Sequence, residues 1–182
     1  MEATTRAEID KNNGLMVVRG VPATVLDTRD ANGRIHPRES FERALRALKK
    51  DEAFESRSLL CTADDHPEQS YPRPAKASHI VIDARIEAGE GGGSPRVDND
   101  WLVPNTQAGK DLRALIEAGA TIGTSIRGLG RQDEDSGQIE DHTYLGTDAV
   151  GQPSAGTFCT FKRPVVRVAP WSGNDNGRRA AA

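Results

Sequence analysis

A serine in a glycine-rich segment is the first candidate for chemistry in this chain. Ser125 lies in ATIGTSIRGLG (residues 120–130), where strand alternation places it on the face opposite the apolar side chains. The flanking glycines allow backbone N–H groups to approach a substrate carbonyl, as an oxyanion hole requires. Many serines in such segments simply lie in turns or on surfaces. Ser125 therefore needs a base and an orienting acid before the segment predicts nucleophilic catalysis.

His66 is the candidate general base. Pro67 follows it and restricts its backbone to extended conformations. The preceding Asp64 and Asp65 favour the imidazolium form that a base adopts when it takes a proton. The same pattern is also typical of a loop histidine that caps a turn. The segment alone leaves both interpretations open.

A third side chain is needed to orient the imidazole and stabilise its charge. Asp148 lies in the strand-like segment YLGTDAVGQPSAG (residues 144–156), on one face with Tyr144 and Gly146. A carboxylate there would be partly buried, which is unusual without a partner. His142, a little earlier on the same expected strand, is the alternative. Residue types and spacing do not choose between them.

The elements that must position these residues follow from hydrophobic periodicity and turn signals. We expect strands over 14–27, 56–63, 77–88, 120–130, 139–150 and 157–168, and helices over 37–50 and 106–118. Pro22 predicts an edge position or a bulge in the first strand. Residues 89–100 are expected to form a flexible hairpin or surface loop. Many strands with two interspersed helices, and no regular βαβ alternation, predict an α+β barrel or sandwich.

Composition limits the class of protein. The 182 residues predict a single domain over 1–170, followed by a flexible polar tail over 171–182 whose last alanines are typical of a cloning remnant. A net charge of −3, from 24 basic and 27 acidic residues, argues against nucleic-acid binding as the main task. No apolar stretch is long enough for a membrane helix, and the first residues lack the apolar region of a signal peptide. We therefore expect a cytoplasmic protein without a membrane partner.

Metal and disulfide chemistry find little support in the sequence. Cys61 and Cys159 form no CxxC motif and are expected to be buried thiols. Several aspartates lie near His66 or further along the chain, but without a ligand-spacing motif. A metal-dependent phosphoesterase is thus a minor alternative, and no metal or cofactor is predicted.

Five blocks, read in order, resemble the prohead core proteases of tailed bacteriophages, the serine peptidases that mature phage capsids. The blocks are NGRIHP (32–37), DDHP (64–67), SHI (78–80), GTSIRGLG (123–130) and GTDAVGQPSAG (146–156). They span most of the chain in the order of the family. That family is similar in fold to the herpesvirus maturation protease. The resemblance therefore implies a mainly antiparallel β-barrel surrounded by helices, in the α+β class.

The resemblance assigns roles to the candidate residues. It implies that Ser125 is the nucleophile, His66 the general base and Asp148 the third member. Because the herpesvirus relatives use a second histidine as third member, His142 remains the alternative.

Neighbouring positions receive supporting roles from the same resemblance. Arg127, through its backbone or its guanidinium, and Gly128 are implied in the oxyanion or substrate region. His36 stands where the family more often has tyrosine and is interpreted as structural, whereas His79 follows a serine as in the family and is interpreted as a strand residue that supports the site.

The implied function is that of a serine endopeptidase of phage assembly. It would cleave scaffold or core proteins and the major capsid protein inside the prohead, in the host cytoplasm, without a cofactor. Self-cleavage is expected in the loop 87–100, which contains Glu87 and Glu90, or in the tail from Ser172 onward. Whether the enzyme forms a homo-oligomer is left open. The alternative is a catalytically inactive scaffold or capsid-assembly protein of the same fold.

Overall fold

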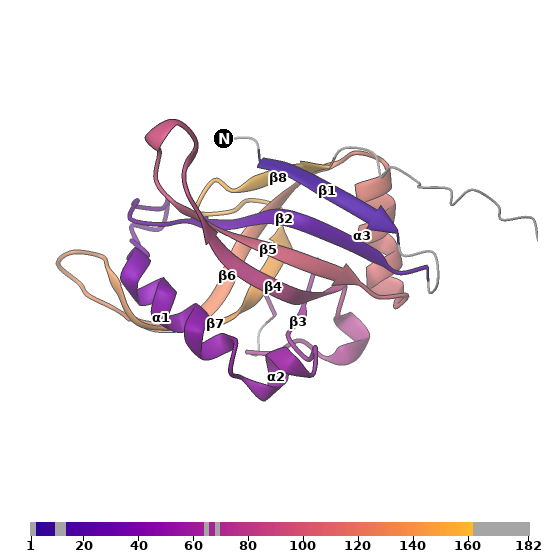
Figure 1. The fold of residues 1–182 in the computed structure, drawn as a ribbon, viewed down its shortest axis with the longest axis horizontal. Helices are drawn as coiled ribbons and strands as arrows, with labels where there is room; N and C mark the ends of the chain where they lie inside the picture. The colour runs from indigo at the N-terminus through magenta and orange to yellow at the C-terminus, as the bar shows by residue number, and fades with distance from the viewer. Residues whose placement is uncertain (1–2, 10–13, 64–65, 68–69, 162–182) are drawn as a thin grey trace, which may run out of the picture.

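The computed structural model describes residues 3–9, 14–63, 66–67 and 70–161, which fold into one curved sheet with helices around it (Figure 1). The strands are β1 (Ala3–Ile9), β2 (Met16–Val25), β3 (Leu60–Cys61), β4 (His79–Glu87), β5 (Arg96–Val103), β6 (Thr121–Gln132), β7 (Ile139–Val150) and β8 (Phe158–Phe161). The helices are α1 (Arg38–Leu48), α2 (Glu52–Glu55) and α3 (Gln107–Glu117), with short 3₁₀ turns η1 (Pro74–Lys76) and η2 (Glu90–Gly92). In this part of the chain no helix is long and apolar enough to cross a membrane.

The sheet is a nearly closed barrel. Its strand order is β3-β4-β5-β2-β1-β8-β6-β7, and every neighbouring pair is antiparallel except β1 with β8. The two ends of this order approach one another, since the Ala149 amide on β7 donates to the carbonyl of Thr62, just after β3 (2.9 Å). The predicted α+β architecture, a mainly antiparallel barrel surrounded by helices, is confirmed.

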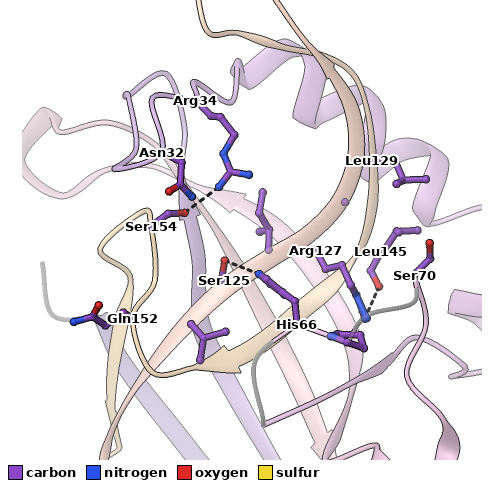
Figure 2. Close-up of a pocket in the computed structure, with 14 residues that line it drawn as sticks. Asn32, Arg34, His66, Ser70, Ser125, Arg127, Leu129, Leu145, Gln152 and Ser154 are labelled. Atoms are coloured by element: carbon purple, nitrogen blue, oxygen red, sulfur yellow. Dashed lines mark hydrogen bonds between the residues drawn. The ribbon is translucent and has the colours of Figure 1, made fainter.

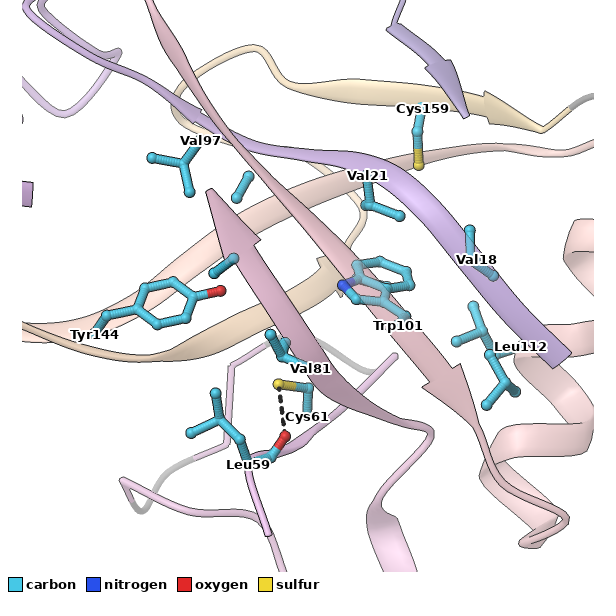
Figure 3. Packing of buried hydrophobic residues seen from close by; sticks show 14 of the residues in the cluster. Val18, Val21, Leu59, Cys61, Val81, Val97, Trp101, Leu112, Tyr144 and Cys159 are labelled. Atoms are coloured by element: carbon cyan, nitrogen blue, oxygen red, sulfur yellow. Dashed lines mark hydrogen bonds between the residues drawn. The ribbon is translucent and has the colours of Figure 1, made fainter. Parts of the chain in front are cut away.

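The core is aliphatic, with Trp101 as its largest buried side chain (Figure 3). Strand alternation on β2, β4 and β5 directs Val18, Val81 and Trp101 inward, so that they pack against one another in the barrel. Helix α1 packs on β7 through a buried stripe at helical spacing, formed by Phe41, Ala44, Leu45 and Leu48. This packing holds the strands that carry the site.

The prediction of a flexible loop over 89–100 is wrong for its second half. Residues 96–100 begin β5, a central strand between β2 and β4. Two aspartates gave the segment its loop-like polarity, yet both are paired with arginines. Arg96 Nε donates to Asp98 (2.8 Å), and Arg85 Nη1 donates to Asp100 (2.9 Å). Ion pairing across neighbouring strand positions therefore let charged residues occupy a central strand.

Other expected elements differ in extent. The strand expected over 56–63 is reduced to β3, because the backbone N–H groups of residues 56–58 donate to carbonyl groups of the short helix α2. Pro22 lies in a central strand rather than at an edge, and a register shift between Pro22 and Thr24 marks the expected irregularity. The strand expected over 157–168 is observed as β8 up to Phe161, and its remainder lies outside the described residues. The expected tail 171–182, with Ser172, also lies outside them.

Candidate active site

Ser125 and Asp148 are brought together by the pairing of β6 with β7. The two residues are direct partners in the antiparallel register, so their side chains emerge side by side on one face of the sheet. His66 comes from the loop after β3, the strand that closes the barrel against β7. Three separate segments therefore supply the three predicted side chains.

The three side chains form one hydrogen-bonded chain. The His66 Nδ1 lies 2.8 Å from Asp148 Oδ2, and its Nε2 lies 3.1 Å from Ser125 Oγ. Figure 2 shows His66 directed toward Ser125. Both residues line a hollow of about 530 Å³. The His66 side chain is 43% exposed whereas that of Asp148 is fully buried, so the chain runs from the surface to the interior.

The surroundings of Asp148 define the proton positions on His66. The Asp148 carboxylate accepts a hydrogen bond from the Thr62 backbone N–H (2.9 Å) and another from the Thr62 hydroxyl (3.4 Å). A carboxylate can only accept, so the Nδ1 of His66 must carry the proton that faces it. The His66 Nε2 is then free to accept the proton of the Ser125 hydroxyl.

Arg127 and Gly128 both line the hollow, but the Arg127 guanidinium turns inward. Its Nη2 donates to the carbonyl oxygens of Leu60 (2.8 Å) and Leu145 (3.2 Å). Its Nε lies 3.6 Å from Asp148 Oδ2. The guanidinium is therefore engaged behind Asp148, and the backbone is the part of Arg127 that is left to serve the oxyanion region. The register of β6 against β7 shifts between Arg127 and Gly128, as in a bulge.

His142 lies apart from the other candidates. Its ring packs against Phe41 (4.5 Å between ring centroids) and His36 (5.6 Å), under α1. Both of its ring nitrogens are buried without a hydrogen-bond partner. A Cβ on Gly128 would lie 2.7 Å from the His142 ring, so this pair packs tightly. The structure brings Asp148, and not His142, to His66.

His79 supports β7 from inside the barrel. Its Nε2 donates to the carbonyl of Thr147, the residue before Asp148 (2.7 Å), and its Nδ1 lies 2.9 Å from the Ser78 hydroxyl. The ring is stacked on Trp101, with 3.9 Å between centroids. Both Cys61 and Cys159 are buried free thiols, as expected.

Several residues around the hollow were not assigned from the sequence. Arg34 and Ser154 lie on the far side of Ser125 from His66 and are joined by a hydrogen bond from Arg34 Nη2 (3.3 Å). Arg34 lies in the block 32–37 and Ser154 in the block 146–156, and this membership is the only feature of the sequence that could have linked them to the site. Thr62 donates to Asp148 mainly through its backbone N–H. The sequence could not indicate this role, because nearly every residue type has a backbone N–H.

A second hollow, of about 700 Å³, lies on the other side of His66 and Pro67. Tyr71, Arg73 and Lys76 are among its lining residues. Within the described ranges, no group of three or more His, Cys, Asp or Glu side chains is arranged to hold a metal ion.

Acidification is expected to destabilise the folded protein between pH 6.5 and pH 4. Burial lowers the pKa of His79 and of His142 from 6.5 to about 4. The unfolded chain takes up these protons as the pH falls below 6.5, whereas the folded protein resists until about pH 4. The stability is therefore complete above pH 6.5 and is lost progressively toward pH 4. For the fully buried His79 the difference corresponds to roughly 3 kcal/mol.

Urea denaturation at several pH values between 7 and 4 measures this loss. The variant His142→Phe removes one titrating ring that makes no hydrogen bond, and it keeps an aromatic ring against Phe41. Its stability is expected to fall less steeply with acid than that of the wild type. Equal slopes for the two proteins would contradict the role of His142.

The structure can also be compared with known proteins. No protein-family model and no curated protein matches this chain. Among solved structures two chains match. One is the capsid assembly protease gp21 of bacteriophage T4, with a TM-score of 0.62 and 22% sequence identity over 82% of this chain and 96% of that chain. At this identity the similarity demonstrates the fold. The resemblance to phage prohead proteases is thus confirmed in three dimensions: the chain has the fold of the T4 capsid assembly protease.

Proposed function

We propose that this protein is a serine endopeptidase in which Ser125 is the nucleophile, His66 the general base and Asp148 the third member. The observation that carries the proposal is the hydrogen-bonded chain from the half-exposed His66 to the buried Asp148, with Ser125 at its outer end. Such a chain has the defining features of a catalytic triad: nucleophile, base and orienting acid in contact, with the nucleophile beside an open hollow.

The reaction follows from these positions. The Ser125 Oγ attacks the scissile carbonyl carbon while its proton passes to the His66 Nε2. The buried carboxylate of Asp148 stabilises the imidazolium that forms. His66 then gives the proton to the leaving amine as the C–N bond breaks, which leaves an acyl group on Ser125. Water, deprotonated by the same histidine, hydrolyses this ester and restores the serine.

We assign the oxyanion site to the backbone of β6 beyond Ser125. The register shift between Arg127 and Gly128 interrupts the ladder here, with Leu145 of β7 as the extra residue, and Gly128 is exposed on the wall of the hollow. A bulge of this kind bends the strands and locally disrupts their hydrogen bonds. A backbone N–H of β6 that faces the hollow at this point can donate to the oxyanion as negative charge develops.

The substrates that we propose are the scaffold or core proteins and the major capsid protein, cleaved inside the prohead in the host cytoplasm. Support comes from the fold, which is that of a protein described as a capsid assembly protease. Confinement in a shell raises the local concentration of enzyme and substrate, so weak binding suffices and self-cleavage becomes favourable. The alternative is an inactive assembly protein of the same fold. Such a protein would not need an intact hydrogen-bonded triad.

Self-cleavage requires an unpaired backbone. Residues 96–100 and Glu87 are hydrogen-bonded within β5 and β4 and are thus poor sites. The connection 88–95, which projects from the barrel between these strands (Figure 1), is the accessible part of the segment expected to be cut. The tail from Ser172 onward remains the other proposed place.

Covalent labelling tests the proposal without knowledge of the substrate. A fluorophosphonate is expected to add one adduct to the protein, on Ser125, as located by mass spectrometry of peptides. His66→Ala is expected to abolish the adduct because the hydroxyl loses its base. Ser154→Ala is the matched control, since Ser154 lines the same hollow but contacts Arg34 instead of a histidine. This control is expected to react like the wild type.

Two results would contradict the proposal. One is an adduct on another serine, and the other is labelling that survives in His66→Ala. A folded wild-type protein that takes no label would favour the inactive assembly protein.

A further inference from the structure

Arg127 touches all three segments that carry the proposed triad. It lies on β6, two residues beyond Ser125. Its Nη2 donates to the carbonyl of Leu60 on β3, the strand that leads into the His66 loop, and to that of Leu145 on β7. Its Nε lies 3.6 Å from Asp148 Oδ2. One side chain therefore connects the strands of the nucleophile, the base and the acid.

The Arg127 guanidinium is also the fixed positive charge next to Asp148. The other titratable groups that influence this region from within the barrel are Cys61, His79 and Tyr144, and all are uncharged at neutral pH. Burial raises the pKa of the Cys61 thiol to about 12 and lowers that of His79 to about 4, and it raises the pKa of the Tyr144 hydroxyl. Among the described residues around Asp148, only Arg127 and the protonated His66 can balance the carboxylate.

The burial of Arg127 is too complete for a side chain that serves only as a spacer. Its side chain is 7% exposed, and its Nε and Nη1 have no hydrogen-bond partner. Desolvation of a guanidinium is costly, and an apolar side chain would fill the same space without that cost. The space is also closed around it, since a Cβ on Gly146 would lie 3.0 Å from Arg127 Nη2 and 2.6 Å from Cys61 Sγ. We therefore attribute the role of Arg127 to its charge rather than to its volume.

We propose that Arg127 is a positioning residue that holds Asp148 in place beside His66, so that His66 keeps its proton on Nδ1 and presents Nε2 to Ser125. The inference rests on the proposed serine-protease function, which it deepens. Arg127 does not touch the substrate through its guanidinium. It acts through Asp148, by its charge at 3.6 Å and by its hydrogen bonds to β3 and β7.

Two substitutions separate the charge of Arg127 from its hydrogen bonds. Arg127→Met removes both, whereas Arg127→Lys keeps a cation and loses the planar fork that reaches two carbonyl groups. The control is Arg131→Met, the same substitution four positions along β6, where the arginine side chain is 69% exposed and pairs with Glu140. The control is expected to behave like the wild type in every measurement.

The first readout is the low-field ¹H resonance of the proton between His66 Nδ1 and Asp148. We expect it in the wild type, in Arg127→Lys and in the control. We expect it to disappear in Arg127→Met because Asp148, without the cation beside it, is no longer held against His66 Nδ1, so that the proton exchanges with water. Near-UV circular dichroism shows whether each variant is folded, and Arg127→Lys keeps the test valid if Arg127→Met is not. A resonance that persists in folded Arg127→Met, or is lost in Arg127→Lys, would overturn the proposal.

The second readout is the pH profile of p-nitrophenyl ester hydrolysis. The loss of a nearby cation is expected to move the acid limb of kcat/KM in Arg127→Met to higher pH. Arg127→Lys is expected to keep the limb in place and lower kcat roughly tenfold. An unshifted limb in Arg127→Met would contradict the electrostatic role. An inactive wild type that retains the resonance would contradict the proposed protease function instead, so the two failures are distinguishable.

Discussion

Replacement of Ser125 by alanine is expected to reduce cleavage of a scaffold or capsid protein on the order of 10⁶-fold. The substitution removes the attacking Oγ and one 3.1 Å hydrogen bond to a half-exposed histidine, while the Cβ and the β6–β7 pairing remain. The melting temperature is therefore expected to stay close to that of the wild type. Gel analysis of a co-expressed substrate, with thermal denaturation of the purified variant, measures both effects.

The same variant decides whether the protein cuts itself. Wild-type protein, concentrated and incubated, is expected to lose mass at the connection 88–95 or in its tail, while Ser125→Ala keeps its intact mass. Identical fragments from both proteins would mean that a contaminating protease made the cuts. Processing of the scaffold by Ser125→Ala at a rate near that of the wild type would refute the role of Ser125.

Asp148→Asn is expected to slow acylation by up to about 10⁴-fold. The amide keeps the shape of the side chain, and its oxygen can still accept from the Thr62 N–H. Its NH₂ group then faces His66 and donates to Nδ1, which places the remaining imidazole proton on Nε2, opposite the Ser125 hydroxyl. This tautomer cannot accept the serine proton. The rate of fluorophosphonate addition measures the loss directly.

His142→Ala is the comparison for this prediction. Because the His142 ring contacts Phe41 and His36 but not His66, its loss is expected to lower stability through packing and leave labelling almost unchanged. Rapid labelling of Asp148→Asn together with slow labelling of folded His142→Ala would transfer the role of third member to the histidine. The geometry that places Asp148 against His66 would then not be the active arrangement.

The part of the site that could be predicted from the sequence is the part that depends on local strand alternation. Alternation in 120–130 correctly placed Ser125 and Arg127 on one face of a strand. It could not show that Asp148 pairs directly with Ser125, because strand register depends on turn geometry and on partners distant in the chain. The choice of Asp148 came from the resemblance, and its contact with His66 is visible only in three dimensions.

The errors in the fold have a common physical cause. The polar start of β5 looked like a loop because Asp98 and Asp100 are normally exposed, and their arginine partners lie on the same or neighbouring strands. The inward turn of the Arg127 guanidinium was equally hidden, since its ligands are the backbone carbonyls of Leu60 and Leu145. Interactions with backbone groups and between distant charges leave little trace in residue types.

Strand β8 gives the barrel a fixed order of assembly. It pairs with β1 on one side and β6 on the other, so it joins the first strand of the described chain to the strand of Ser125. These pairings can form only after synthesis has reached Phe158–Phe161, and contacts over such sequence separation form slowly. Until then β6, the strand of Ser125, has only β7 as a hydrogen-bonded neighbour in the sheet.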